Sequence, residues 1–385
     1  MKYDVIIVGA GPAGAQCARY ISEHSKYSVL LLDKTQEIGE PKKSTAGTFP
    51  ETMQVFDLPR SVVQNKTHTM IFEGPTETAE LPMEGYVLDF WKLKKFLVER
   101  AVHHGAEVRI KSTVTKPILQ NKKIVGVVYE DLEGIHEVEG NIIIDASGPS
   151  AVLATQLGLK KLNQKTHWVG IEYEMDKLKL QHQHAMLMKF DHRYAPGGYS
   201  WIFSTGNNHG KVGNCWRLDF FSKNGGKGSS EEYLKKWIAD DKRLQDGFAL
   251  EVHGGDAYLE PATLPRSTDN FMAIGDSVSS IHPLLAEGIR PGMFSGLFAA
   301  QTAIQSLRKK DTSVKQLEKY DILWKQKYGN YKLACKIMHF LYNFSNTHID
   351  VLVKNLRNVD QTTIQKVISY QFTLKDILKF SPLKF

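Results

Sequence analysis

Three glycines near the start of the chain, Gly9, Gly11 and Gly14, have a spacing that suits the binding of a phosphate group. They follow the β-branched run YDVIIVG and lead into a helix expected over residues 13–25. In a strand–turn–helix unit, the first glycine permits the turn, the second lets the backbone approach a phosphate, and the third lets the helix pack against the strand. The helix start, where Ala13 lies, would bind a pyrophosphate through its N–H groups and dipole. The sequence therefore predicts a dinucleotide site.

An acidic residue, Asp33, ends the second apolar run, SVLLLD. At that position a carboxylate can accept hydrogen bonds from a ribose diol, and it disfavours a 2′-phosphate. Both NAD and FAD are compatible with these features.

A second glycine-containing stretch, GDSVSSIHPLLAEGIRPGM, favours FAD. Gly275 and Asp276 end an apolar strand, where a carboxylate can bind a ribityl hydroxyl, a group that NAD lacks. Gly288 and Ile289 open another predicted helix, whose N–H groups can face the electron-rich edge of a flavin. The alternative role for Asp276 is a helix N-cap. Together with the first motif, this stretch predicts bound FAD.

Candidates for substrate contact and proton transfer lie in two further places. Tyr199, Trp201 and Phe203 alternate along YSWIFS and would share one face of a strand, which suits a lipid chain but equally suits a protein core. His282 precedes the predicted flavin helix and could act as an acid near neutral pH. The alternative for His282 is a loop histidine bound to the backbone.

The elements that must position these residues follow from hydrophobic periodicity. Strand and helix alternate at the start of the chain, and a helix is expected over 89–104. Longer strands with turn residues follow over 166–259, interrupted by one helix near 230–240. We expect an α/β fold in which a Rossmann-like FAD-binding domain carries an inserted antiparallel-sheet substrate domain and a helical C-terminal segment. The expected parts are 1–160 (FAD-binding, first part), 161–260 (substrate domain), 261–310 (FAD-binding, second part) and 311–385 (helical segment).

The combination of GAGPAG, Asp33, DASGPS and GDSVSSIHPLLAEGI resembles flavoproteins of the p-hydroxybenzoate hydroxylase fold, and within them the geranylgeranyl reductase family. That family carries a Y-x-W-x-F-P signature followed by G-x-G, and YSWIFS and GKVG are similar to it. The resemblance covers nearly the whole chain. It implies FAD-dependent saturation of C=C bonds in geranylgeranyl chains, most simply on archaeal-type isoprenoid ether lipids. Reduction of chlorophyll side chains, aromatic hydroxylation and flavoprotein electron transfer are the alternatives.

The resemblance also implies site residues. Tyr199, Trp201 and Phe203 would bind the substrate, and Tyr199, His282 or a water would supply the proton. The cofactor-binding set implied by the motifs and the resemblance is Gly9, Gly11, Ala13, Gly14, Asp33, Ser44, Ala46, Gly47, Val114, Gly275, Asp276, Gly288 and Ile289.

Three positions depart from the family pattern. Ser204 stands where the signature has proline, and Ser44 stands where family members often have a cysteine near the flavin. A hydroxyl cannot perform thiol redox chemistry, so we expect Ser44 to contact the flavin only as a lining residue. An arginine expected near the cofactor is replaced by Phe90, with Lys92 as a candidate substitute.

Composition limits the remaining possibilities. The three cysteines among 385 residues are far apart and odd in number, which argues against a disulfide framework. Neither they nor the histidines have metal-ligand spacing, so we expect no metal. We expect a cytoplasmic chain without a signal peptide or membrane span, in contact with a membrane surface through its net charge of +7. The expected partners are a prenylated lipid and an electron donor such as NAD(P)H or ferredoxin, and no nucleic acid.

Overall fold

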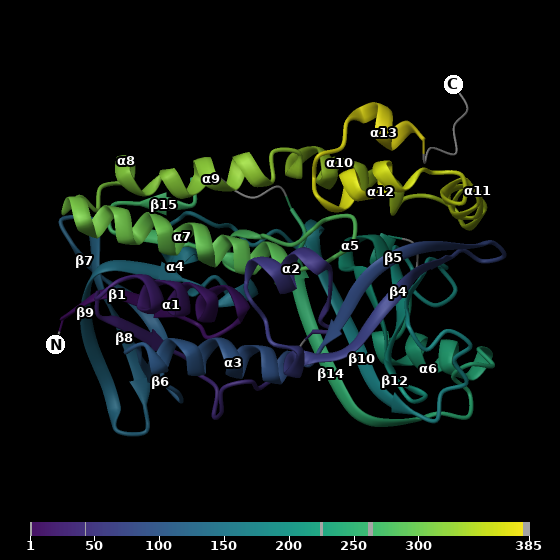
Figure 1. Ribbon diagram of the computed structural model, residues 1–385, viewed down its shortest axis with the longest axis horizontal. Coiled ribbons are helices and arrows are strands. Elements are labelled where there is room, and N and C mark those ends of the chain that lie inside the picture. Colours follow the sequence, from purple (N-terminus) through teal and green to yellow (C-terminus); the bar gives the residue numbers. More distant parts are fainter. Residues whose placement is uncertain (1, 43, 224–225, 261–264, 380–385) are drawn as a thin grey trace. The chain divides into compact units, whose positions relative to one another are not determined.

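The computed structural model describes residues 2–42, 44–223, 226–260 and 265–379. The chain forms two compact units, each made of three separate stretches, and Figure 1 shows their elements along the sequence. Unit 1 is Met1–Lys42, Phe90–Leu162 and Glu260–Gly329, and unit 2 is Lys43–Asp89, Asn163–Leu259 and Asn330–Phe385.

Unit 1 is built on a parallel sheet in the order β6-β2-β1-β9-β16, as expected for a Rossmann-like domain. Its central strands are apolar on both faces because helices cover both sides of such a sheet. An antiparallel pair, β7 and β8, extends from β9, and β15 pairs with β16. The strands are β1 (Lys2–Val8), β2 (Val29–Leu32), β6 (Glu107–Arg109), β7 (Thr113–Gln120), β8 (Lys123–Asp131), β9 (Gly134–Asp145), β15 (Ser267–Thr268) and β16 (Phe271–Ala273).

Two long helices of unit 1, α1 and α7, pack against each other unusually closely. A Cβ on Gly296 would lie 2.2 Å from the carbonyl oxygen of Ala13, so only glycine permits this approach. The helices expected over 13–25 and 89–104 are confirmed as α1 and α3, with ends shifted by one residue, and the helix predicted to open at Gly288 and Ile289 is confirmed as α7. The helices of unit 1 are α1 (Pro12–His24), α3 (Phe90–His103), α4 (Val152–Gln156), α7 (Ile289–Lys309), α8 (Val314–Leu317) and α9 (Lys319–Lys327).

Unit 2 is built on a mostly antiparallel sheet in the order β14-β10-β13-β12-β11-β4-β5-β3. Its neighbouring strands run antiparallel except β11 and β4, which are parallel. The strands are β3 (Gly47–Thr48), β4 (Val63–Glu73), β5 (Thr78–Leu88), β10 (His167–Asp176), β11 (Ala185–Lys189), β12 (Gly198–Gly206), β13 (His209–Arg217) and β14 (Phe248–Tyr258).

The two units divide the chain differently from the four parts expected from the sequence. Residues 43–89, expected in the first FAD-binding part, supply β3, β4 and β5 to the second sheet. The expected segment 311–385 is shared, since unit 1 extends to Gly329. The expected boundary at residue 261 lies outside the described residues. The alternation of apolar residues along a strand shows which of its faces is buried but not which sheet it joins. For this reason the sequence did not assign residues 43–89 to the second sheet.

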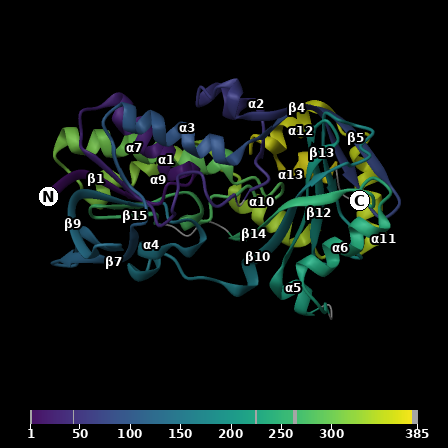
Figure 2. The same cartoon turned by 90° about the horizontal axis from the view of Figure 1, so that it is seen from below.

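The helices of unit 2 include the one expected near 230–240, which is confirmed as α6 and begins with a capping box of Ser229 and Glu232. The region 166–259, expected as strands interrupted by one helix, contains a further short helix, because β13 ends at Arg217 and α5 follows it directly. Figure 2 shows the C-terminal helices α10 to α13 gathered together. The helices are α2 (Pro50–Val55), α5 (Leu218–Lys223), α6 (Ser230–Asp240), α10 (Tyr331–Leu341), α11 (Asn346–Leu356), α12 (Gln361–Ile368) and α13 (Leu374–Leu378).

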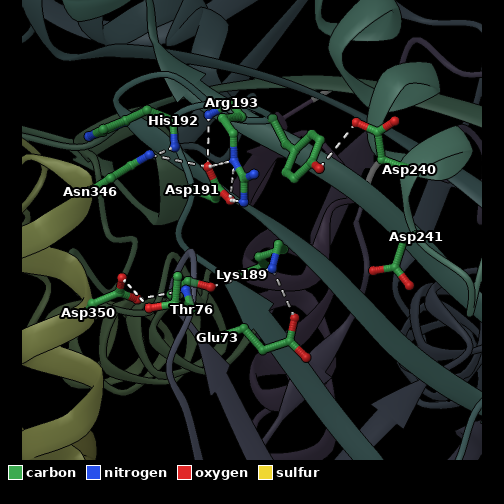
Figure 3. A network of polar contacts seen from close by, with 12 residues as sticks. Glu73, Thr76, Lys189, Asp191, His192, Arg193, Asp240, Asp241, Asn346 and Asp350 are labelled. Carbon is green, nitrogen blue, oxygen red and sulfur yellow. Dashed lines mark hydrogen bonds and ion pairs between the residues drawn. The ribbon is translucent and has the colours of Figure 1, made fainter.

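Polar contacts tie α11 to the sheet of unit 2 (Figure 3). The carboxylate of Asp350 accepts hydrogen bonds from the Thr76 N–H at 2.9 Å and from its hydroxyl at 2.8 Å. The side chain of Asn346 accepts from the His192 N–H at 3.1 Å and donates to Asp191 at 3.4 Å. These contacts join α11 to the rest of unit 2, to which α10, α12 and α13 also belong. Across the described ranges, no helix is both long and apolar enough to cross a membrane.

Candidate functional site

The glycine turn after β1 has the shape that a pyrophosphate requires. Gly9 has a φ of +105°, and a Cβ there would lie 2.4 Å from the carbonyl oxygen of Ala146. A Cβ on Gly14 would lie 2.0 Å from the carbonyl oxygen of Gly9, so helix and turn touch. At Gly11, the N-cap of α1, a Cβ would meet no described atom within 4 Å, and no described side chain caps the helix. The first turn of α1 therefore offers N–H groups to an anion from an open side.

Asp33, which follows β2, is hydrogen-bonded to this glycine turn. Its Oδ2 accepts a hydrogen bond from the Ala10 N–H at 2.6 Å, and its Oδ1 accepts one from the Thr35 N–H at 2.8 Å. A carboxylate has about four acceptor positions, so these two bonds leave capacity for a ribose diol. The arrangement fits the predicted ribose contact, which stays a prediction.

The second glycine motif converges with the first at Ala13. A Cβ on Gly275 would lie 2.8 Å from Cβ of Ala13, and one on Gly292 would lie 3.8 Å from the same atom. Gly288 is the N-cap of α7, and the described part of the chain provides no side-chain cap there. Asp276 Oδ1 lies 4.0 Å from the position of a Gly288 Cβ, inside a short 3-10 helix rather than at its N-cap. Two helix starts and a carboxylate thus surround one place in unit 1, and these residues fit FAD.

His282 has the backbone contacts of the structural alternative. Its ring is fully buried, and its Nδ1 accepts hydrogen bonds from the N–H groups of Leu284 at 3.2 Å and Leu285 at 3.3 Å. A nitrogen that accepts two N–H groups carries no proton, so only Nε2 of His282 can hold one. A role as proton donor stays a prediction.

The remaining cofactor candidates have different surroundings. Within unit 2, the Ser44 hydroxyl accepts a hydrogen bond from the Ala46 N–H at 3.1 Å and so holds its own turn. Ala46 is buried with a φ of +58°, and a Cβ on Gly47 would lie 2.4 Å from the Phe203 ring. Val114 belongs to the apolar core beside the sheet of unit 1. Direct contact of these four residues with FAD stays a prediction.

Lys94, near the start of α3, is buried, although no sequence motif marked it as a site residue. Lys94 donates to the carbonyl oxygens of Glu40 at 3.3 Å and Pro41 at 3.0 Å, and its amino group lies over the ring of Phe90. Lys92, the candidate substitute for the missing arginine, is exposed. Lys94 thus anchors the chain just before the loop that contains Ser44.

The sheet of unit 2 has two different faces. One face packs under α6, where Ile202 of β12 and Val212 of β13 join Leu234 and Trp237 of α6 in an apolar cluster, the α6 core. Tyr199, Trp201 and Phe203 alternate with Ile202 and therefore lie on the opposite face, which we call the aromatic face. The expectation that these three side chains share one strand face is confirmed, and they do not form part of the α6 core.

Aromatic rings surround Tyr199 on the aromatic face. Its ring centroid lies 5.7 Å from that of Phe190, 5.7 Å from that of Trp201 and 6.4 Å from that of Tyr342. Burial raises the pKa of Tyr199 well above its usual range, and the neighbouring Cys215 adds to this shift. Burial also raises the pKa of the Cys215 thiol to about 12. Both groups therefore keep their protons near neutral pH.

Trp201 is fixed by a glycine beneath it and a carboxylate beside it. A Cβ on Gly213 would lie 2.3 Å from Cζ2 of Trp201, which explains why GKVG ends in glycine. The Trp201 Nε1–H donates to Oε2 of Glu172 at 2.9 Å. The indole is therefore held in one orientation.

Sequence reasoning missed two buried charges on this face, Glu172 and Lys211. Their exposed fractions are 5% and 3%. Oε2 of Glu172 also accepts a hydrogen bond from the Thr45 hydroxyl, and Nζ of Lys211 donates to the Thr45 carbonyl oxygen at 3.1 Å. Burial raises the pKa of Glu172, although the charge of Lys211 acts in the opposite direction. The available signal was a charged residue inside each of the apolar strands WVGIEYEM and GKVG.

Two glutamates and a histidine on the same sheet lie close enough together to hold a metal ion. Ligand atoms of Glu174, Glu251 and His253 lie within 4.8 Å of one another. Nε2 of His253 lies 3.4 Å from a carboxylate oxygen of each glutamate. These residues place a histidine between two carboxylates, and the expectation of no metal stays a prediction.

Comparison with known proteins decides the family. A family model described as an FAD binding domain matches residues 2–236. A digeranylgeranylglycerophospholipid reductase of Haloferax volcanii is 40% identical over 376 residues, covering 93% of this chain and 90% of that one. The chain belongs to the digeranylgeranylglycerophospholipid reductase family. Its cofactor is FAD, in agreement with the two glycine motifs.

Other matches agree with this family and define the fold. A digeranylgeranylglycerophospholipid reductase of Methanocaldococcus jannaschii is 30% identical and covers 98% of this chain and 97% of that one. The crystal structure of a geranylgeranyl bacteriochlorophyll reductase-like protein from Thermoplasma acidophilum superimposes with a TM-score of 0.88 at 24% identity, covering 98% and 99% of the two chains. The flavin-dependent brominase Bmp2 shares the fold, with a TM-score of 0.76 at 18% identity over 98% and 97% of the chains.

Replacing Asp33 by Ala in this family member should weaken FAD binding. The change removes the predicted ribose acceptor and the two hydrogen bonds that Asp33 accepts from Ala10 and Thr35, and hydrogen bonds to charged groups contribute about 1.5–3 kcal/mol. FAD affinity should fall by about tenfold to a hundredfold, measured by titrating apoprotein with FAD. Asp131→Ala is the matched control, because Asp131 accepts from the Glu133 N–H at 2.8 Å in the same local geometry. Equal FAD affinity of Asp33→Ala and wild type would contradict the assignment.

Replacing Gly213 by Ala should displace the indole of Trp201. The new methyl group would overlap the ring, and overpacking of this kind costs about 1–3 kcal/mol. We expect a lower melting temperature and a changed near-UV circular dichroism spectrum. Gly254→Ala is the control on β14, because its Cβ would have its nearest neighbour at 3.8 Å. A Gly213→Ala variant that matches Gly254→Ala in both measurements would show that the indole does not depend on this glycine.

Proposed function

We propose that this protein is an FAD-dependent reductase that saturates isolated C=C bonds in the geranylgeranyl chains of archaeal-type isoprenoid ether lipids. The observation that carries the proposal is the 40% identity to a digeranylgeranylglycerophospholipid reductase along nearly the full length of both chains. The aromatic face supports it, because an apolar wall suits a lipid chain.

The reaction makes two demands on the chain. An unconjugated alkene is a poor electrophile, so it must be held in position and away from water, and good alignment contributes about 7–11 kcal/mol to such reactions. Reduced FAD supplies the hydride for one carbon, and the other carbon must receive a proton. Tyr199, Trp201 and Phe203 would form the wall that aligns the chain. Tyr199 and the Nε2 position of His282 are the candidate proton sources from the protein.

The rival functions use the same fold. An aromatic hydroxylase or a flavoprotein electron carrier would bind FAD through the same glycine motifs, and a brominase shares the architecture, so fold alone does not choose among them. A reductase of chlorophyll side chains would also reduce a geranylgeranyl group. The curated relatives favour the lipid, because several of them carry the name digeranylgeranylglycerophospholipid reductase.

We also propose that the protein works in the cytoplasm at the surface of a membrane, where such a lipid resides. The net charge of +7 favours anionic lipid. Short helix α13 exposes Leu374 and Leu378 one turn apart, with exposed fractions of 59% and 46%, beside the exposed Lys375 and Lys379. Apolar and basic side chains together suit contact with a bilayer interface. The electron donor, which could be NAD(P)H, ferredoxin or another reductant, is to be identified by reduction assays.

Trp201→Leu should slow reduction without loss of FAD. A misplacement of about 1 Å can cost about a hundredfold in rate, so single-turnover oxidation of pre-reduced enzyme by a geranylgeranyl lipid should slow by about that factor. Trp237→Leu, in the α6 core, is the control and should lose stability but keep its rate. Equal rates for the two variants would contradict the role of Trp201.

The same assay tests the proposed function in wild type. Under anaerobic conditions the lipid should gain two hydrogens for each bond reduced, read by mass spectrometry. Two results together would contradict the reductase: the lipid stays unsaturated, and the flavin is oxidised only after oxygen is admitted. They would favour the aromatic hydroxylase instead.

Binding to anionic liposomes should depend on α13. Leu374→Glu with Leu378→Glu should reduce flotation with liposomes at low salt, and added salt should weaken wild-type binding because charges are screened over about 8 Å near physiological ionic strength. Leu132→Glu with Ile135→Glu is the control, since these side chains are 86% and 76% exposed on the acidic β8–β9 hairpin. If wild type does not bind liposomes at low salt, or if both double variants lose binding equally, the assignment of α13 as the membrane contact is wrong.

A further inference from the structure

Thr45 is held at both ends by a pair of buried charges in unit 2. Its hydroxyl donates to Oε2 of Glu172, the same atom that accepts from Nε1 of Trp201. Its carbonyl oxygen accepts from Nζ of Lys211, which also donates to the carbonyl oxygen of Leu88 at 3.2 Å. Strands β10, β12 and β13 thus converge through these side chains on one residue of the loop before β3.

Stability alone does not explain why two charges are buried here. Taking both Glu172 and Lys211 out of water is costly, and well-packed apolar side chains of similar volume often stabilise a protein as well or better. Each charged group makes specific hydrogen bonds with fixed directions, which apolar side chains cannot supply. The contacts of the pair lie on the aromatic face, since Trp201 is one of the partners.

The loop held in this way contains candidate cofactor residues on both sides of Thr45. Ser44 precedes it, Ala46 and Gly47 follow it, and the ring of Phe203 packs where Gly47 lacks a Cβ. We propose that Glu172 and Lys211 are a positioning pair that holds Trp201 and the loop with the predicted flavin contacts Ser44, Ala46 and Gly47 in one fixed relation, and so sets both FAD affinity and substrate alignment. The part that concerns substrate rests on the proposed function.

The test replaces the charges by apolar side chains of similar length. Glu172→Met with Lys211→Met should keep the melting temperature within a few degrees, because the pair is replaced and no single charge is left buried. FAD affinity of the apoprotein should fall by about tenfold or more, and the visible absorption bands of the bound flavin should shift. Wild-type FAD affinity and an unchanged flavin spectrum in this variant would overturn the proposal.

An ion pair elsewhere in the same sheet, Glu73 with Lys189, is the matched control. A carboxylate oxygen of Glu73 lies 3.3 Å from Nζ of Lys189 (Figure 3). The same carboxylate lies 2.6 Å from Arg243, and the Glu73 side chain is 13% exposed. Glu73→Met with Lys189→Met removes two comparable charges that touch neither Thr45 nor Trp201. We expect wild-type FAD affinity and spectrum in this control, whatever its stability. An equal fall of FAD affinity in the control would show that removing any buried charges from this sheet weakens FAD binding, and it would overturn the proposal.

A conservative variant separates positioning from proton transfer. Glu172→Gln keeps an oxygen that can accept from both Thr45 and Trp201, but an amide cannot act as an acid. Recovery of FAD affinity and of most of the single-turnover rate supports positioning. A loss of about a thousandfold in rate with wild-type FAD affinity would make Glu172 an acid and overturn its role as a positioning residue. FAD affinity and spectrum need no lipid, so they test the pair even where the proposed substrate fails.

Discussion

Close approach of two helices at a single alanine is the constraint on which the cofactor site depends. Gly275, Gly292 and Gly296 all lack a Cβ where the chain meets Ala13, and the closest position would lie 2.2 Å from its carbonyl oxygen. Because these positions are glycine, the starts of α1 and α7 can lie beside one another in unit 1. Two sets of N–H groups could then bind one dinucleotide, and this predicted site would account for the two distant glycine motifs in one chain.

The sheet of unit 2 combines two roles by using its two faces differently. The face under α6 is an ordinary apolar core, and it carries stability through Trp237 and its neighbours. The aromatic face holds rings and two buried charged side chains, Glu172 and Lys211, which are costly to bury on a surface that only has to pack. A brominase shares the architecture at 18% identity, so the fold by itself does not define the reaction, and the proposed substrate contacts are assigned to the side chains of the aromatic face.

Much of the fold and part of the site could be predicted from local patterns. The glycine motifs, α1, α7 and the single strand face of Tyr199, Trp201 and Phe203 are set by spacing that a reader can see in the sequence. Glu172 and Lys211 could not be assigned, because each looks like an ordinary solvated charge until the strand pairing brings it to Thr45. The membership of residues 43–89 in the second sheet was missed for the same reason.

By itself, the sequence determined the cofactor class, the kind of elements and the family signature, because each depends on residues a few positions apart. Only the tertiary structure decided which charges are buried, which side of β12 faces the α6 core, and which sheet β4 and β5 join. It also showed that Nδ1 of His282 is bound to the backbone and that Gly213 makes room for an indole. These facts depend on contacts between segments far apart along the chain, and local periodicity carries no information about such pairings.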